Sequence, residues 1–333
     1  MRGAYAVLAT ILTTLVFGGL LTPLYVIVVA ALMGLLRPSD IGMRNALIGV
    51  TIQGPQLMGA MGIQRTTQDS ARVAGSLSGA GLVALLGMGP AYLVVIAFYS
   101  ISVLLTWRAG SERSSPRAAS VPASSASPLR DLTQGIAYVW TTPQLLAVML
   151  LAFVLNGTAF PLFNSLLPYV AKEVYGADQA TLGAMAACGA LGSLLGSVVL
   201  SRQGRGIGPG RQTIVCAAGW YVLLLVFAQI EHPAGGLVAL FFAGCLQSAG
   251  LVPMSAILLR SSEAGFRGRV MGIRMLALYA NLPGLLLAAP LIAWAGYCLT
   301  ASFYCLIGLA LTGLITLRWR ACLWHRQAVT NQG

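Results

Sequence analysis

The chain has 333 residues, of which 57% are hydrophobic and only 8% are charged. Since roughly a quarter of the residues of a soluble domain are charged, this composition excludes a soluble globular protein. The net charge of +12 is compatible with nucleic-acid binding, but the positions of the arginines explain it differently. No nucleotide, hydrolase or metal-ligand motif is present in the sequence, so we expect no enzyme activity, no cofactor and no metal site.

Apolar blocks of about twenty residues recur along the chain, the length that an α-helix needs to cross a hydrocarbon core of roughly 30 Å. Divided at charged residues and at Gly/Pro breaks, these blocks predict an all-α integral membrane protein with about ten transmembrane helices. The predicted spans are residues 3–20, 22–41, 61–87, 89–107, 143–169, 180–200, 212–230, 234–258, 270–294 and 297–317.

The basic residues gather on one side of this predicted topology. With Met1 in the cytoplasm and the spans alternating, all nineteen arginines fall on the cytoplasmic side and Lys172 alone falls outside. The positive-inside rule predicts this bias for one orientation only. We therefore expect a multi-pass protein of the cell inner membrane with both termini cytoplasmic. Its positive charge faces anionic lipid headgroups, and no nucleic acid is needed to explain it.

A polar stretch rich in Ser, Ala, Pro and Arg divides the spans into two groups. Its last part, Pro128 to Trp140, carries apolar residues at helical spacing, which predicts a short amphipathic helix on the inner leaflet. The predicted domains are an N-terminal bundle of four helices (1–107), a cytoplasmic linker with this short helix (108–142), a C-terminal bundle of six helices (143–319) and a cytoplasmic tail (320–333).

The two halves of the chain repeat at a constant offset of 210 residues. Pro23 matches Pro233, Gly34 matches Gly244, and Met61-Gly62-Ile63 matches Met271-Gly272-Ile273. Parallel repeats of this kind are typical of transporters. The two spans between residues 143 and 200 have no counterpart in the first half, which predicts an N-terminal truncation or a misplaced start codon. A ten-span architecture complete in itself is the alternative.

Four short stretches resemble transporter motifs. Gly34 to Leu47 resembles the end of a fourth helix with the pattern Pro-Ala-Arg-x-Ala-Leu-Leu, although Gly42 and Met43 replace its Pro and Ala. Ala71 to Gly81 is similar to the antiporter motif of a fifth helix, and Arg267 to Met271 is typical of the start of an eleventh helix. The antiporter-like motif comprises Gly75, Ser76, Gly79 and Gly81, with Ser76 in place of a proline. A loop motif comprises Ser201, Arg202, Gly204 and Arg205, with Ser201 in place of an aspartate.

Taken together, these motifs resemble the major facilitator superfamily, in particular its drug and siderophore exporters related to enterobactin exporters and macrolide efflux proteins. The resemblance implies a two-bundle helical transporter in which the ten spans are helices three to twelve. It also implies a monomeric, proton-coupled exporter that moves a small amphipathic molecule, such as a drug, siderophore or metabolite, by alternating access. A truncated membrane protein that transports nothing and an uptake carrier of the same fold are the alternatives.

Six charged residues on two spans form a candidate gate. Since ionisable groups inside a membrane are costly, those that persist have a partner or a function. We predict a cytoplasmic network whose ion pairs break and reform as the bundles rock; the alternative is a static network that only fixes packing. Arg72 lies about 10 Å deeper than Arg65, where an anionic substrate or the coupling protons could reach it. The network comprises Arg37, Asp40 and Arg44 on one span and Arg65, Asp69 and Arg72 on the next.

Six polar residues embedded in apolar sequence are candidates for the substrate cavity, because each needs a hydrogen-bond partner inside the membrane. They are Asn156, Asn164, Gln247, Ser248, Tyr279 and Asn281. Two of them stand near Gly157 and Pro283, where a broken helix would expose backbone to a substrate. Bonding between helices is the alternative for each residue. Finally, Gly189, Gly192 and Gly196 predict a helix face that allows close backbone packing.

Overall fold

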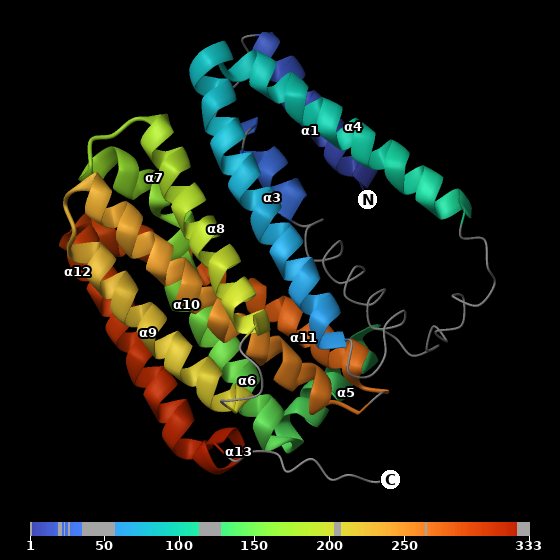
Figure 1. Cartoon of the computed structure of the whole chain (residues 1–333), viewed down its shortest axis with the longest axis vertical. Coiled ribbons are helices and arrows are strands. Elements are labelled where there is room, and N and C mark those ends of the chain that lie inside the picture. Colours follow the sequence, from blue (N-terminus) through green and yellow to red (C-terminus); the bar gives the residue numbers. More distant parts are fainter. Residues whose placement is uncertain are drawn as a thin grey trace. The chain divides into compact units, whose positions relative to one another are not determined.

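The computed structural model describes most of the chain as helix (Figure 1), and its described residues contain no β-strand. The described residues are 2–18, 22, 24–25, 27–34, 57–112, 128–202, 208–263 and 265–324. The helices are α1 (Arg2–Phe17), α3 (Leu57–Leu86), α4 (Met88–Glu112), α5 (Pro128–Thr141), α6 (Pro143–Val154), η3 (Leu155–Ala159), η4 (Pro161–Ser165), α7 (Leu167–Tyr169), η5 (Val170–Val174), α8 (Gln179–Arg202), α9 (Pro209–Gln229), α10 (Pro233–Arg260), α11 (Arg267–Leu278), α12 (Asn281–Arg318) and α13 (Arg320–Trp324).

Six segments of the described chain are long and apolar enough to cross a membrane, which confirms the predicted all-α integral membrane fold. They are Gly89–Thr106, Pro143–Val174, Gln179–Leu200, Pro209–Gln229, Pro233–Arg260 and Arg267–Arg318. The last segment holds two predicted spans, because the backbone leaves the helical conformation at Gly296. The predicted spans 3–20 and 61–87 correspond to α1 and α3, whereas span 22–41 is described only in part.

The chain divides into two compact units, residues 1–47 with 78–128, and residues 48–77 with 129–333. Within the first unit, α1 packs against α4. The Tyr5 ring stacks on Tyr99 at 5.7 Å between centroids, and Phe17 lies against Gly89, so the two helices run antiparallel. The unit boundary falls inside α3, and the predicted division at the 108–142 linker stays a prediction.

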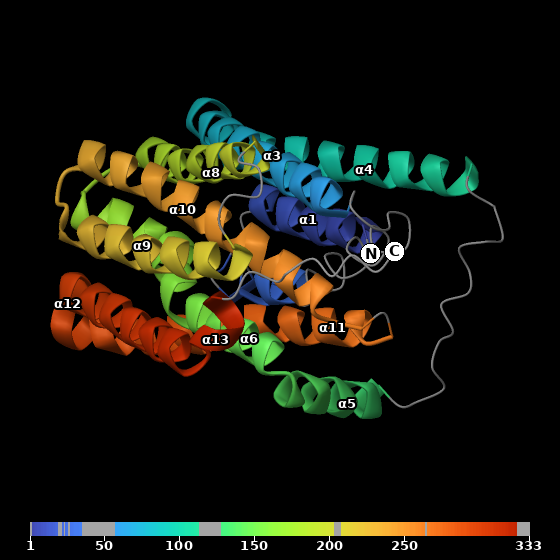
Figure 2. The same cartoon turned by 60° about the horizontal axis from the view of Figure 1, so that its bottom comes forward.

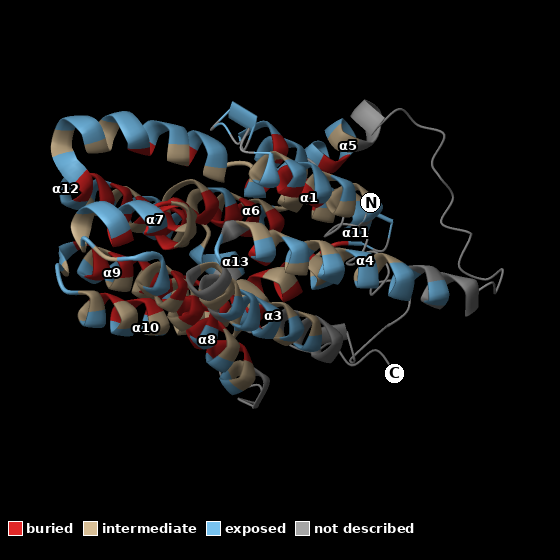
Figure 3. Ribbon diagram, turned by 90° about the horizontal axis from the view of Figure 1, so that it is seen from above, coloured by how far each residue is buried: buried red, intermediate tan, exposed pale blue. Residues whose placement is uncertain are grey.

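In the second unit, α8, α10, α9 and α12 run side by side, as Figures 1 and 2 both show. Buried residues gather along α6 and on the sides of α8, α9 and α10, while most of α4 and the first part of α12 is exposed (Figure 3). Trp220 is at the centre of this core, where its ring meets the edges or faces of Phe160 and Phe163 at 5.2 and 5.7 Å between centroids. Such edge-to-face pairs suit aromatic quadrupoles.

The glycines of α8 allow α10 to approach backbone to backbone. A Cβ atom built on Gly192 would lie 1.9 Å from the Phe241 carbonyl oxygen, and one on Gly196 would lie 2.3 Å from that of Cys245. In the other direction, a Cβ on Gly244 would lie 2.1 Å from the Gly189 carbonyl oxygen. The predicted close-packing face is therefore confirmed, because Gly192 and Gly196 leave no room for a Cβ atom and the Gly189 backbone meets Gly244.

The segment Pro143–Val174 is one membrane span with three wide, π-helical turns. Pro161 has no N–H group to donate to the Gly157 carbonyl four residues earlier, which weakens the regular helix here. Within η4, the Leu166 N–H donates to the carbonyl five residues earlier, that of Pro161, at 2.9 Å. Short π-helical segments are frequent at functional sites. At Asn156-Gly157, where the sequence predicted a broken helix, the structure has the π-helical turn η3 and the span continues.

The predicted amphipathic helix is α5, and one side of it packs on α11. The Tyr138 ring stacks on Phe266 at 4.4 Å between centroids, and a Cβ on Gly135 would lie 3.1 Å from Ile273. Ile136 and Trp140 stay exposed. The prediction that α5 lies on the inner leaflet depends on this exposed apolar side.

Two glycines with left-handed backbone end the corresponding helices of the two halves. Gly87 has φ 81° just after α3, and Gly296 has φ 80° inside α12. They stand 209 residues apart, one residue from the offset of the sequence repeat. A conformation that favours glycine thus recurs where the repeat predicts a turn between spans.

Candidate functional site

One long-range polar contact joins two residues that the sequence placed in different predicted sites. The Arg72 guanidinium, on the part of α3 that belongs to the second unit, donates a hydrogen bond to Asn164 Oδ1. Asn164 lies in the π-helical turn η4, which begins at Pro161. A charged donor makes this a stronger bond than one between neutral groups.

A second polar contact reaches the same turn from α12. Asn281 Nδ2 donates to Ser165 Oγ at 3.4 Å, and the Asn281 Oδ1 atom is buried without a partner among the described residues. Asn281 opens α12 immediately after α11 ends at Leu278, so the helix break predicted near Pro283 is present. Two adjacent side chains of η4 therefore receive hydrogen bonds from α3 and from α12.

The two irregular helices also touch through their backbones. A Cβ on Gly284 would lie 2.1 Å from the Gly157 carbonyl oxygen, so the start of α12 approaches η3 as closely as glycine permits. The Tyr304 hydroxyl, farther along α12, donates to the Gly284 carbonyl at 2.6 Å. The hydrogen bonds at η4 therefore lie next to a close contact between the backbones of η3 and α12.

Asp69 lies one helical turn before Arg72 and is only 3% exposed. Three other members of the predicted gate network, Arg37, Asp40 and Arg44, lie outside the described residues. The same holds for the side chain of Arg65, whose backbone is part of α3. The gate network therefore stays a prediction.

The remaining cavity candidates lie elsewhere in the second unit. Asn156 is buried and donates to the Ala152 carbonyl at 2.8 Å within its own helix. Gln247 is buried between α10 and α8, where its Oε1 accepts from Ser193 Oγ at 3.0 Å. Ser248 is fully buried, and Tyr279 follows the end of α11. The structure thus brings Asn164 and Asn281 together at η4, whereas Gln247 lies at the contact between α8 and α10.

The glycines of the antiporter-like motif make no close contact with the described part of the chain. Among the described residues, no atom would lie within 4 Å of a Cβ on Gly75, Gly79 or Gly81. Ser76 Oγ donates to the Val73 carbonyl at 3.0 Å, within its own helix. In the loop motif, Ser201 and Arg202 end α8 without described side chains, and Gly204 and Arg205 lie outside the described residues.

Three polar contacts of the second unit were missed by sequence reasoning. Ser165 is the acceptor for Asn281, Thr158 Oγ1 lies 2.6 Å from the Tyr221 hydroxyl, and Thr66 Oγ1 lies 3.5 Å from Ser197 Oγ. Small hydroxyl residues are common in apolar helices, where they bond to their own backbone, so their identity alone carries little signal. The one signal that could have identified Ser165 is its position next to Asn164 in the sequence.

An apolar groove of about 810 Å³ adjoins the helix break that precedes Asn281. Its walls come from α6, η3 and both parts of α12, and they include Phe153, Gly157, Pro283, Trp294 and Phe303. Polar contacts at one turn and an aromatic groove at its side suit a molecule with a polar and an apolar end.

The sequence comparison decides the family. The family model of the Major Facilitator Superfamily matches residues 2–288 and, in a second match, residues 149–324. The chain belongs to the major facilitator superfamily. No curated protein sequence matches it significantly. Members of this superfamily are secondary transporters and not enzymes, so the chain is a multi-pass membrane transporter of a small molecule. Family membership shows fold and general activity, whereas specificity depends on side chains in the site.

Proposed function

We propose that this major facilitator protein exports a small amphipathic molecule in exchange for protons. The observation that carries the proposal is the Arg72–Asn164 hydrogen bond, which joins α3 to a π-helical turn of the first span after the linker. A bond that must break when two helices separate is suited to a gate, because each state of the transporter then has its own set of contacts. The arginine is also a site for an anionic group of the substrate.

Asp69 is the described carboxylate best placed for proton coupling. Its burial one turn from Arg72 means that a change in water access would alter the cost of its charge. An acid that loads and releases a proton in this way links the proton gradient to the state of the gate. Asp40 is the second candidate acid, and it lies outside the described residues.

The proposed orientation rests on the arginine distribution, and the proposed monomeric state rests on the family resemblance. The protein works as a monomer in the cell inner membrane, with both termini in the cytoplasm and the Arg37, Asp40, Arg44, Arg65, Asp69 and Arg72 network at the cytoplasmic side. The wider substrate cavity includes Asn156, Gln247, Ser248 and Tyr279 beside the two asparagines at η4.

The test measures proton-driven transport in inverted membrane vesicles. Two fluorescent amphipathic probes are used, the cation ethidium and the anion 1-anilinonaphthalene-8-sulfonate, with and without collapse of the pH gradient. We expect gradient-dependent movement of a probe into the vesicles, lost in Arg72→Ala and Asp69→Asn proteins at wild-type amounts. Arg260→Ala is the matched control, since Arg260 is an exposed arginine at the end of α10. Full activity in both site variants would reject the gate, and movement in the opposite direction would indicate an uptake carrier.

A further inference from the structure

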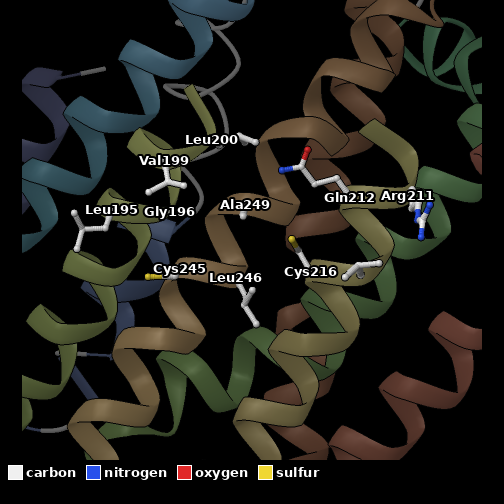
Figure 4. A pocket seen from close by; sticks show the side chains of 11 residues that line it. Leu195, Gly196, Val199, Leu200, Arg211, Gln212, Cys216, Cys245, Leu246 and Ala249 are labelled. Atoms are coloured by element: carbon white, nitrogen blue, oxygen red, sulfur yellow. The ribbon is translucent and has the colours of Figure 1, made fainter. Parts of the chain in front are cut away.

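A second cavity, of about 640 Å³, lies between α8, α9 and α10 (Figure 4), and neither Arg72 nor Asn164 lines it. Because α10 packs against both α8 and α9, it forms the floor of this groove, and the other two helices form the walls. The lining residues are Leu195, Gly196, Val199, Leu200, Arg211, Gln212, Val215, Cys216, Cys245, Leu246 and Ala249.

The groove opens toward the surroundings of the second unit. Leu195 and Val199 on one wall and Val215 on the other are each about half exposed, at 47%, 51% and 58%. All three are aliphatic, and they lie within segments that are apolar enough to span the membrane. A lipid chain is the solvent that such a surface meets, since water is absent from the hydrocarbon core.

One end of the groove is polar. Arg211 lies in the first turn of α9, and the Gln212 side chain next to it points toward Leu200 across the groove (Figure 4). The Arg211 guanidinium stacks over the Trp324 ring at 5.6 Å, and Trp324 itself is partly exposed. A tryptophan beside an arginine is typical of the level of the lipid headgroups. A stacked guanidinium still presents the donors in its plane, which match a phosphate.

The groove is therefore amphipathic along its length. From Arg211 to Cys216 the helix rises about 8 Å. The polar end and the aliphatic walls are therefore close enough for one molecule to contact both. In the orientation that the arginines predict, the polar end faces the cytoplasm. The cytoplasmic leaflet holds the anionic lipids, and basic pockets between helices on that side bind their headgroups.

We propose that this groove binds one anionic phospholipid. Gln212 contacts its headgroup, Arg211 supplies the positive charge at that end of the groove, and an acyl chain lies over Val199, Val215 and Leu246. The occupant is a lipid because the walls are aliphatic and open to the bilayer, and it is anionic because the charged side chain at the polar end is an arginine.

The experiment uses the purified full chain in detergent, with bound lipid counted by native mass spectrometry. The probes are phosphatidylglycerol and phosphatidylcholine with the same acyl chains, and inorganic phosphate is added in a third arm. We expect one tightly bound phosphatidylglycerol, preferred over phosphatidylcholine by about fivefold, the effect of one basic residue near the surface. Equal binding of the two lipids, or displacement of phosphatidylglycerol by inorganic phosphate, would overturn the proposal.

Two kinds of variant locate the site. Val215→Trp and Val199→Trp fill the groove from opposite walls and should abolish the bound lipid, whereas Arg211→Gln should remove only the preference for the anionic headgroup. Val222→Trp, seven residues farther along α9 and about as exposed as Val215, is the control for the bulky substitution. Arg318→Gln is the control for the charge, because Arg318 also stacks on a tryptophan, Trp319, at 5.5 Å. Retention of the lipid by both groove-filling variants would place it elsewhere and reject the proposed site.

The groove also contains two natural reporters, Cys216 and Cys245, neither of which forms a disulfide. Phosphatidylglycerol should slow their reaction with N-ethylmaleimide at least severalfold, while the exposed Cys322 should react at an unchanged rate. Equal rates at Cys216 and Cys245 with and without the lipid would contradict the proposal independently of mass spectrometry.

Discussion

The Arg72 guanidinium bonds to Asn164 Oδ1 across 92 positions of the sequence. The donor lies on a regular helix and the acceptor on a π-helical turn, so the bond holds an irregular piece of backbone against α3. If this contact is what both residues contribute to transport, removing either one has the same effect as removing both.

A double-mutant cycle tests this coupling. Arg72→Ala and Asn164→Ala should each lower the transport rate by about tenfold or more, since a hydrogen bond to a charged group contributes about 1.5–3 kcal/mol. The double variant should be no slower than the slower single variant. Additive losses, measured in the same vesicle assay, would show that the two residues act separately.

The space beside each glycine predicts different effects for two Gly→Ala substitutions, one in α8 and one in α11. Gly192→Ala would force Cβ into the Phe241 carbonyl and should destabilise the protein by about 1–3 kcal/mol, the usual cost of overpacking. Gly272→Ala, in α11, meets no described atom within 4 Å and should be neutral or stabilising by up to about 1 kcal/mol. Thermal unfolding in detergent would show whether each variant is more or less stable than the wild type. An unchanged Tm for Gly192→Ala would contradict the close approach of the two helices.

The buried contact between Ser193 and Gln247 predicts non-additive stability. Ser193→Ala leaves Gln247 Oε1 without its partner and should cost about 1–3 kcal/mol. The double variant with Gln247→Leu should recover part of that loss, because the unpaired polar group is then gone. A transport loss in Gln247→Leu with unchanged Tm would instead support the proposed role of Gln247 in the substrate cavity.

Stability toward acid depends in part on Asp178, just before α8. Its Oδ1 accepts from the Thr181 backbone N–H and hydroxyl, both at 2.9 Å, and these bonds lower the Asp178 pKa below its ordinary value of 3.8. Because the pKa is lower in the folded state, the stabilisation is present above pH 3.8 and is lost as the pH falls through the depressed pKa.

The measurement compares Tm between neutral and acid pH for the wild type, Asp178→Ala and Asp178→Asn. The alanine variant should have a lower Tm at neutral pH, and the difference from the wild type should shrink in acid. Asparagine also caps a helix but does not titrate, so Asp178→Asn should lack the acid-dependent part of the change. A difference between wild type and Asp178→Ala that is constant with pH would exclude this effect.

The sequence by itself determined the membrane spans of the second half. The predicted ranges 180–200, 212–230 and 234–258 agree with α8, α9 and α10 to within three residues at each end. In a lipid environment each helix must satisfy its own backbone hydrogen bonds, so length and apolar composition are local signals that suffice to find it. The glycine face of α8 was equally local, because its spacing lies within one helix.

Only the tertiary structure decided which polar residues meet. Asn164 and Gln247 look alike in sequence, yet one bonds to Arg72 and the other to Ser193. The depth at which Asp69 is buried was also outside the reach of a hydropathy pattern. These features depend on how each helix is rotated and packed against helices distant in the chain, and no local property of the sequence carries that information.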